Sequence, residues 1–159
     1  MKVSVIVVAA GSGRRFGYER NKLFYPLRGK PVLAHTLMHV FAASSVDEVV
    51  IVNAERDHED IVSIVESLHP SMPVRYALGG AEREDSVYNG LMATSRDADV
   101  VMVHDGSRPF AGPEWYDNAV GVMAKAKAAV YAIPVKDTVK EREIAGGQGL
   151  QTVRTLDRS

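Results

Sequence analysis

A loop of small residues followed by cations comes directly after the first apolar run of the chain. Residues 9–16 read Ala-Ala-Gly-Ser-Gly-Arg-Arg-Phe, and Lys22 follows seven residues after Arg15. Because glycine and alanine have little or no side chain, such a loop lets backbone N–H groups approach a ligand closely. The arginines and the lysine add positive charge at the same place. The combination predicts a pocket for a polyphosphate, with a nucleoside triphosphate as the first candidate.

The loop matches neither of two common phosphate-binding motifs. A P-loop needs Gly-x4-Gly-Lys-Ser/Thr, a string that the sequence does not contain. The dinucleotide fingerprint needs a third glycine where Phe16 stands and an acid after the next strand, which ends in Asn53. At this point the alternative is an ordinary strand-to-helix turn with solvated arginines.

Composition narrows the class of protein. The chain has 159 residues, 46% of them apolar and 25% charged, which suits one soluble domain with a real core. The net charge of −1 gives no general attraction to nucleic acid or anionic membrane, and the absence of cysteine excludes disulfides and thiolate chemistry. The run Val3–Ala10 is too short for a membrane span, and its arginines follow it and do not precede it, so we expect no signal peptide and a cytoplasmic protein.

Short apolar runs alternate with helical patterns along the chain, which favours an α/β fold. Such an alternation predicts a mainly parallel sheet with helices on both faces. Apolar residues recur at helical spacing from Leu33, from Ile61 and from Trp115. Asp57 could cap the second of these helices, and Pro31 suits the first turn of the first. The expected strands are Val3–Ala9, Glu48–Asn53, Val74–Leu78, Asp99–His104 and Ala129–Pro134.

Three unusual segments follow three of these strands. They are residues 9–22, residues 79–86 (Gly-Gly-Ala-Glu-Arg-Glu-Asp-Ser) and residues 104–110 (His-Asp-Gly-Ser-Arg-Pro-Phe). Because ligands bind beyond the carboxyl ends of parallel strands, we expect the three segments to share one crevice.

The chemistry of the second and third segments stays open at this level. The two glycines at 79 and 80 suit the edge of a nucleobase, and Ser86 could either bind that base or cap the following helix. Asp105 could hold a metal, a ribose or substrate hydroxyls, or could be a turn residue paired with Arg108. His35 and His39 have i,i+4 spacing but no third metal ligand, and we interpret them as ordinary helix residues.

These motifs together resemble one family. Residues 9–16, 29–36, 79–83, 85–87, 104–110 and 135–138, with Lys22, occur in the order found in 2-C-methyl-D-erythritol 4-phosphate cytidylyltransferases of the non-mevalonate isoprenoid pathway. The resemblance covers nearly the whole chain. It implies a Rossmann-like nucleotidyltransferase sheet in residues 1–135 and a protruding β-arm, residues 136–159, that builds a homodimer. Extended patterns at Lys136–Lys140 and Gln151–Leu156, around the glycines of 146–149, agree with such an arm.

The resemblance also implies a reaction. CTP and methylerythritol 4-phosphate, a polyol phosphate, would give CDP-methylerythritol and pyrophosphate, with Mg²⁺ held mainly through phosphates and not by protein ligands. Arg15 and Lys22 would be catalytic. The implied substrate-binding residues are Asp105, Arg108, Thr138 and, from the partner copy's arm, Arg158. The implied CTP-binding residues are Ala9, Ala10, Gly11, Gly13, Arg14, Gly80, Arg83, Ser86 and Gly106.

The chain departs from the family pattern at three points. Asn21 stands where a proline commonly precedes the lysine, Ala81 replaces an acid, and the sequence stops at Ser159 where the family continues. We therefore expect that the family's C-terminal portion is missing here, either because the chain is truncated or because the sequence is incomplete. Two alternatives are a ribitol 5-phosphate cytidylyltransferase and a CTP-binding fragment without turnover.

Overall fold

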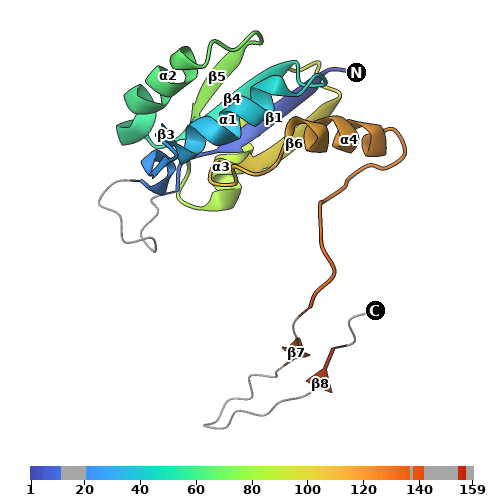
Figure 1. The fold of residues 1–159 in the computed structure, drawn as a ribbon. Coiled ribbons are helices and arrows are strands. Elements are labelled where there is room, and N and C mark those ends of the chain that lie inside the picture. Colours follow the sequence, from blue (N-terminus) through green and yellow to red (C-terminus); the bar gives the residue numbers. More distant parts are fainter. Residues whose placement is uncertain (12–20, 137, 142–153, 157–159) are drawn as a thin grey trace, which may run out of the picture. The chain divides into compact units, whose positions relative to one another are not determined.

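The chain forms two compact units in the computed structural model. The first spans Met1–Lys127 and the second Ala128–Ser159. The structure describes residues 1–11, 21–136, 138–141 and 154–156 (Figure 1). The expected division at residue 135, between a catalytic domain and an arm, stays a prediction.

A parallel sheet forms the centre of the first unit. Its strands are β1 (Val3–Val8), β4 (Glu48–Asn53), β5 (Val74–Leu78) and β6 (Val100–Asp105), in the order β5-β4-β1-β6. All three pairings are parallel. The two central strands are almost entirely buried, as their unbroken runs of valine and isoleucine predict. These strands lie within one residue of the expected bounds.

Helices cover both faces of the sheet, which confirms the predicted fold class. Helices α1 (Val32–Ala42), α2 (His58–Ser67) and α4 (Pro113–Met123) lie on one face, where Leu37, Ile61 and Tyr116 join the core with Val5 and Ile51 (Figure 1). Short elements precede α1: the 3-10 turn η2 (Lys22–Phe24) and the two-residue strands β2 (Pro26–Leu27) and β3 (Lys30–Pro31).

Helix α3 (Arg83–Ala93) covers the opposite face alone among the described helices, and it lies very close to the sheet. A Cβ on Gly90 would lie 2.6 Å from Ile6 Cγ2 and 2.8 Å from Val52 Cγ2. Only glycine permits this approach without displacing the core. The close packing holds α3 against the central strands β1 and β4.

Two expectations about element ends are corrected. Asp57 does stand at the N-cap position of α2, but its side chain makes no cap hydrogen bond, because it accepts one from Asn21 instead. Pro31 precedes the first turn of α1 as its N-cap and does not lie within that turn.

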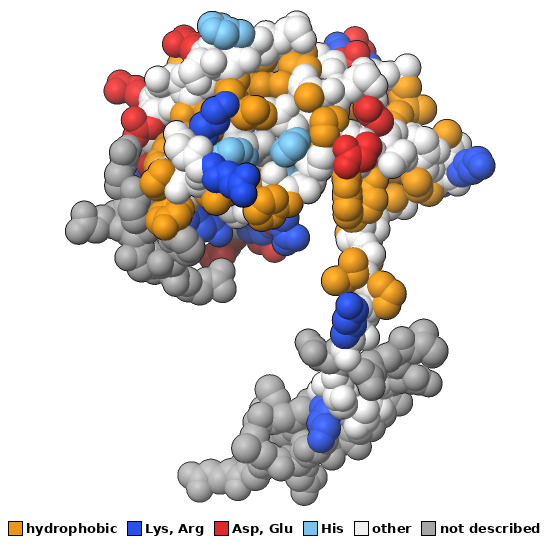
Figure 2. Space-filling model, in the orientation of Figure 1, with side chains coloured by type: hydrophobic (Ala, Val, Ile, Leu, Met, Phe, Trp, Pro, Cys, Tyr) orange, Lys and Arg blue, Asp and Glu red, His pale blue; other side chains and the backbone are white. Residues whose placement is uncertain are grey.

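The expected strand Ala129–Pro134 is wrong. These residues belong to the second unit and are assigned to no strand. A strand is defined by backbone pairing, which an apolar composition cannot supply by itself. Val130, Tyr131, Ile133 and Val135 expose their side chains, and such apolar side chains appear in orange along this segment (Figure 2).

The described residues of the predicted hairpin form a short antiparallel pairing in the second unit. Strands β7 (Lys140–Glu141) and β8 (Arg154–Thr155) pair antiparallel, and Leu156 N–H donates to Val139 O at 2.9 Å. Most of Lys136–Lys140 therefore lies outside the paired strand. The expected glycine-rich tip, residues 146–149, lies outside the described residues.

Candidate functional site

The carboxyl edge of the sheet gathers the segments that the sequence singled out. Hydrogen bonds join the loops that leave neighbouring strands: Ala9 N–H donates to Val52 O at 2.7 Å, and Gly106 N–H donates to Val8 O at 2.9 Å. Gly79 N–H donates to Asn53 O at 3.0 Å. The three segments therefore do share one edge, as predicted from the parallel order.

Small residues are required where the first two loops meet. A Cβ added to Gly79 would collide with the Cβ of Ala10, and it would lie 3.3 Å from Ser86 Oγ. The backbone of Gly79 therefore lies directly against Ala10, with no space for a side chain between them. Ala10 and Gly11 follow this contact along the chain, and no described residue outside its chain neighbours lies within 4 Å of a Cβ built on Gly11.

Ser86 shapes the glycine loop and does not cap α3. Its hydroxyl accepts from Gly80 N–H at 3.1 Å and donates to Glu82 O at 3.1 Å. The cap comes from Glu82, which forms a capping box with Asp85. Of the two readings left open by the sequence, the helix cap is thus excluded. The Gly80 N–H is already bonded within the loop.

Two arginines hold the carboxylate of Asp105 at the end of β6. Arg83 Nη2 donates to Oδ1 at 3.0 Å, and Arg108 Nε donates to Oδ2 at 2.7 Å. Burial alone raises the pKa of Asp105, but the hydrogen bonds and charges of the two arginines outweigh it and bring the pKa below its ordinary value. The pairing with Arg108 was foreseen as an alternative, whereas the link to Arg83 was not.

The neighbours of Asp105 are fixed by the fold. Thr36 of α1 donates to Gly106 O at 2.8 Å, and His104 Nε2 lies 3.1 Å from Arg108 O. Burial lowers the pKa of His104, whose ring lies 5.5 Å from that of Tyr116. Neutral His104 is therefore a packing residue that supports the turn after β6.

Lys22 opens the turn η2 and is partly exposed. Asn21, directly before it, is buried and makes two side-chain hydrogen bonds, one to Leu23 N–H and one to Asp57. Sequence reasoning noted Asn21 only as a departure from the family pattern. The contact with Asp57 could not be inferred, because 36 residues separate the two partners.

Several predicted site residues cannot be placed at this edge. Gly13, Arg14, Arg15 and Arg158 lie outside the described residues. Thr138 belongs to the second unit, where it is exposed shortly before β7. Their functions stay predictions.

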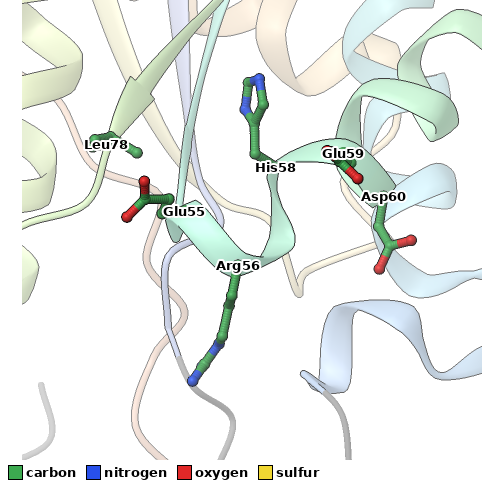
Figure 3. Close-up of a pocket in the computed structure, with 6 residues that line it drawn as sticks. All are labelled: Glu55, Arg56, His58, Glu59, Asp60 and Leu78. Carbon is green, nitrogen blue, oxygen red and sulfur yellow. The ribbon is translucent and has the colours of Figure 1, made fainter.

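A pocket that no motif indicated lies beside the ends of β4 and β5. It has a volume of about 620 Å³, and the 3-10 turn η3 (Glu55–Asp57) contributes to its wall (Figure 3). Arg56 and His58 extend in opposite directions from this segment in Figure 3. Three carboxylates in the lining disfavour a triphosphate here. The lining residues are Glu55, Arg56, His58, Glu59, Asp60 and Leu78.

The described residues contain neither a cluster of metal ligands nor a membrane-spanning helix. No group of three or more His, Asp or Glu side chains in this part of the chain could hold a metal ion. His35 Nε2 contacts Leu27 O at 2.7 Å, as an ordinary helix residue would. None of the described helices has the length and hydropathy needed to cross a membrane.

The chain is similar to known proteins of one family. Residues 3–159 match the family model of 2-C-methyl-D-erythritol 4-phosphate cytidylyltransferase (IspD). A relative of that name from Synechococcus elongatus is 43% identical over 137 residues, which are 86% of this chain and 59% of the relative. Another from Bacillus velezensis is 38% identical over all 159 residues, 66% of its own length. The chain thus spans about three fifths of the curated relatives that it matches.

Solved structures agree. The crystal structure of 4-diphosphocytidyl-2C-methyl-D-erythritol synthase from Anaerococcus prevotii superposes with a TM-score of 0.84 at 32% identity. The match covers 99% of this chain and 65% of that one. A Francisella tularensis 2-C-methyl-D-erythritol 4-phosphate cytidylyltransferase at 24% identity and a TM-score of 0.65 supports the fold.

Proposed function

The chain belongs to the 2-C-methyl-D-erythritol 4-phosphate cytidylyltransferase family, and on that premise we propose that it transfers CMP from CTP to 2-C-methyl-D-erythritol 4-phosphate and releases pyrophosphate. One observation of the structure carries the proposal. The loop at Ala10, the glycines at 79 and 80 and the Asp105 cluster meet at one edge of the sheet. This edge is where α/β folds bind nucleotides.

The chemistry suits cationic side chains better than a general base. The attacking group is an oxygen of a phosphate monoester, which is largely ionised near neutral pH, so no proton has to be removed first. The barrier lies in the approach of two anions and in the charge that develops on the α-phosphate and the leaving pyrophosphate. We propose that Arg15 and Lys22 stabilise this charge.

The nucleotide would lie beside the small residues of the loops that follow β1 and β5. In this proposal Ala10, Gly11, Gly80 and Ser86 surround the cytosine, with Ser86 acting chiefly by holding the loop in shape. Ala9, Gly13, Arg14, Arg83 and Gly106 would complete the CTP site. The buried position of Ala9, whose N–H is bonded to Val52 O, gives it a role in shaping the loop.

The polyol phosphate would meet the cluster at the end of β6. Asp105 accepts hydrogen bonds from its arginines, and in the proposed complex it would accept them from substrate hydroxyls as well, because each carboxylate oxygen has two lone pairs. Arg108 and Thr138 would bind the same substrate. We further propose a homodimer in which Arg158 of the partner's arm reaches the substrate phosphate. The exposed apolar side chains of the second unit support a partner that covers them.

A divalent cation such as Mg²⁺ fits this site only if the phosphates carry it. Arg83 and Arg108 already balance the charge of Asp105 and would repel a cation beside it, and the described residues offer no other ligand cluster. When bound with the triphosphate, the cation would neutralise part of its charge. We propose that the reaction takes place in the cytoplasm.

Replacing Lys22 with alanine tests the proposal. Turnover of CTP with 2-C-methyl-D-erythritol 4-phosphate should fall about 10²-fold, while CTP affinity changes little, since the lysine acts mainly on charge that develops during the reaction. Lys30→Ala, which removes an exposed lysine on β3, is the matched control. Pyrophosphate release and CTP binding by calorimetry would both be measured. Equal turnover in Lys22→Ala and the control contradicts the role of Lys22.

The same assay separates the alternatives. A preference for ribitol 5-phosphate over methylerythritol 4-phosphate would replace the proposed substrate. CTP binding with no release of pyrophosphate would identify a binding fragment.

A further inference from the structure

A pair of buried polar residues links the start of the Lys22 turn to η3, the 3-10 turn that follows β4. We propose that the hydrogen bond between Asn21 and Asp57 positions Lys22 for its reaction, so that both are positioning residues. This inference rests on the proposed function, because it takes the role of Lys22 from there.

Asn21 fixes the turn from its own side. It is 5% exposed and stands at the N-cap of η2, where its Oδ1 accepts from Leu23 N–H at 3.2 Å. Its backbone carbonyl accepts from Phe24 N–H at 3.0 Å. Leu23 is buried in the core beside Leu33. Lys22 lies between these two anchored neighbours, and its backbone direction therefore follows that of Asn21.

Asp57 holds the other end of the link. It is 7% exposed and accepts from Asn21 Nδ2 at 2.8 Å. An aspartate at an N-cap normally accepts from the backbone of the next turn, and here it makes no such bond. Its other oxygen lies 3.8 Å from Nε of the exposed Arg56, a weak contact. Among the described residues, the principal partner of this buried carboxylate is therefore Asn21. Asp57 does not cap α2.

The link matters because it adds a polar anchor to a short turn that the buried side chain of Leu23 already ties to the core. It is a turn of three residues, and the strands that follow it are two residues long. A displacement of a catalytic group by about 1 Å can cost 10²-fold in rate. A side-chain bond to Asp57 ties the turn to η3, which begins two residues after the end of the fully buried strand β4.

Reversing the link is the sharpest test. Asn21→Asp puts two carboxylates face to face and removes the donor, while Leu23 N–H keeps its acceptor. We expect kcat to fall about tenfold with the KM for the polyol phosphate unchanged. The double variant Asn21→Asp/Asp57→Asn restores a donor opposite a carboxylate, and kcat should return to within about threefold of the unaltered chain. Asn118→Asp, an exposed change of equal charge on α4, is the control.

A second readout does not depend on activity. Trypsin cleaves after Lys22, and mass spectrometry resolves that product from cleavage at other basic residues. Cleavage at Lys22 should accelerate in Asn21→Asp and slow again in the double variant, with the denaturation midpoint measured alongside.

The outcomes separate the inference from its premise. If Lys22→Ala lowers turnover but Asn21→Asp changes neither kcat nor cleavage, the positioning role is overturned while the proposed function stands. Failure of the double variant to recover also overturns it. If Lys22→Ala itself leaves turnover intact, the premise fails, and the trypsin measurement shows separately whether the link holds the turn.

Discussion

Two carboxylates at opposite edges of the same sheet, one buried and one partly exposed, show how differently a paired charge can be used. Glu48 begins β4 at the amino edge and is 2% exposed. It accepts from Ser4 Oγ at 2.6 Å, from Ser95 N–H at 2.6 Å and from Ser95 Oγ at 2.7 Å. Asp105 ends β6 at the carboxyl edge, where its side chain is 28% exposed and its arginine partners are largely in solvent.

The difference lies in what remains accessible. Burial opposes ionisation of Glu48, but hydrogen bonds from Ser4 and Ser95 and the charge of Arg75 outweigh it, so its pKa is lowered. Asp105 has a lowered pKa for the same kind of reason. The groups that bind Glu48 are engaged within the fold, whereas Arg83 and Arg108 still have N–H donors that can bind an anion. The network around Glu48 therefore stabilises the fold, and the network around Asp105 leaves donors that a ligand could bind.

Among the substitutions that test this comparison, we expect the largest effect on stability at Glu48. Glu48→Ala leaves Ser4 and the Ser95 N–H without their acceptor, and we expect it to lower the free energy of unfolding by about 3 kcal/mol. Urea denaturation followed by circular dichroism measures this. Glu66→Ala, at an exposed position on α2, should change it by less than about 0.5 kcal/mol. A loss at Glu48 no greater than at Glu66 would mean that the network contributes nothing to stability.

Asp105→Asn tests the other edge. The amide keeps one acceptor but loses the charge that holds Arg83 and Arg108, so we expect the KM for the polyol phosphate to rise about tenfold. CTP affinity should stay nearly constant, because the triphosphate gains nothing from a neighbouring carboxylate. Glu114→Gln on α4 is the control for lost charge. If CTP binding collapses instead, Asp105 belongs to the nucleotide site.

Acid should weaken both networks. Because the pKa values of Glu48 and Asp105 are lower in the folded chain, the unfolded chain takes up protons first as the pH falls. Their contribution to stability is complete above the ordinary carboxylate range and is lost as the pH falls through the folded values. Denaturation midpoints between pH 7 and about pH 3 should therefore drop, and less steeply in Glu48→Gln. If the midpoint falls as steeply with pH in Glu48→Gln as in the unaltered chain, Glu48 does not contribute to the loss of stability in acid.

The sequence predicts the scaffold of both edges but not the contacts made on it. The strands through Val5, Val50 and Tyr76 lie where their apolar runs predict, and parallel order alone brings the loops after them together. The contacts of Glu48 with Ser95 and of Arg83 with Asp105 join residues 47 and 22 positions apart. No local pattern encodes such pairs, because they depend on how α3 packs against the sheet.

Where local rules were applied to single residues, the three-dimensional setting changed the result. Asp57 obeys the positional rule for a helix cap yet bonds to Asn21, since a buried amide donor lies within reach. The apolar run Ala129–Pro134 satisfies the composition of a strand but is assigned to none. The place of these residues along the chain follows from local patterns, whereas their function depends on the partners that the fold brings near them.

The smallest effect is expected at an ion pair that shares the amino edge with Glu48 but lies in solvent. Lys2 Nζ is 2.8 Å from Asp97 Oδ1. The hydrogen bond to Asp97 raises the pKa of Lys2, yet an exposed pair gains little, because water solvates both charges nearly as well when they are apart. Lys2→Ala should leave the urea midpoint where it is in the unaltered chain, at low and at high salt. If Lys2→Ala lowered the stability to urea as much as Glu48→Ala, burial would not explain why Glu48 contributes to stability and the exposed pair does not.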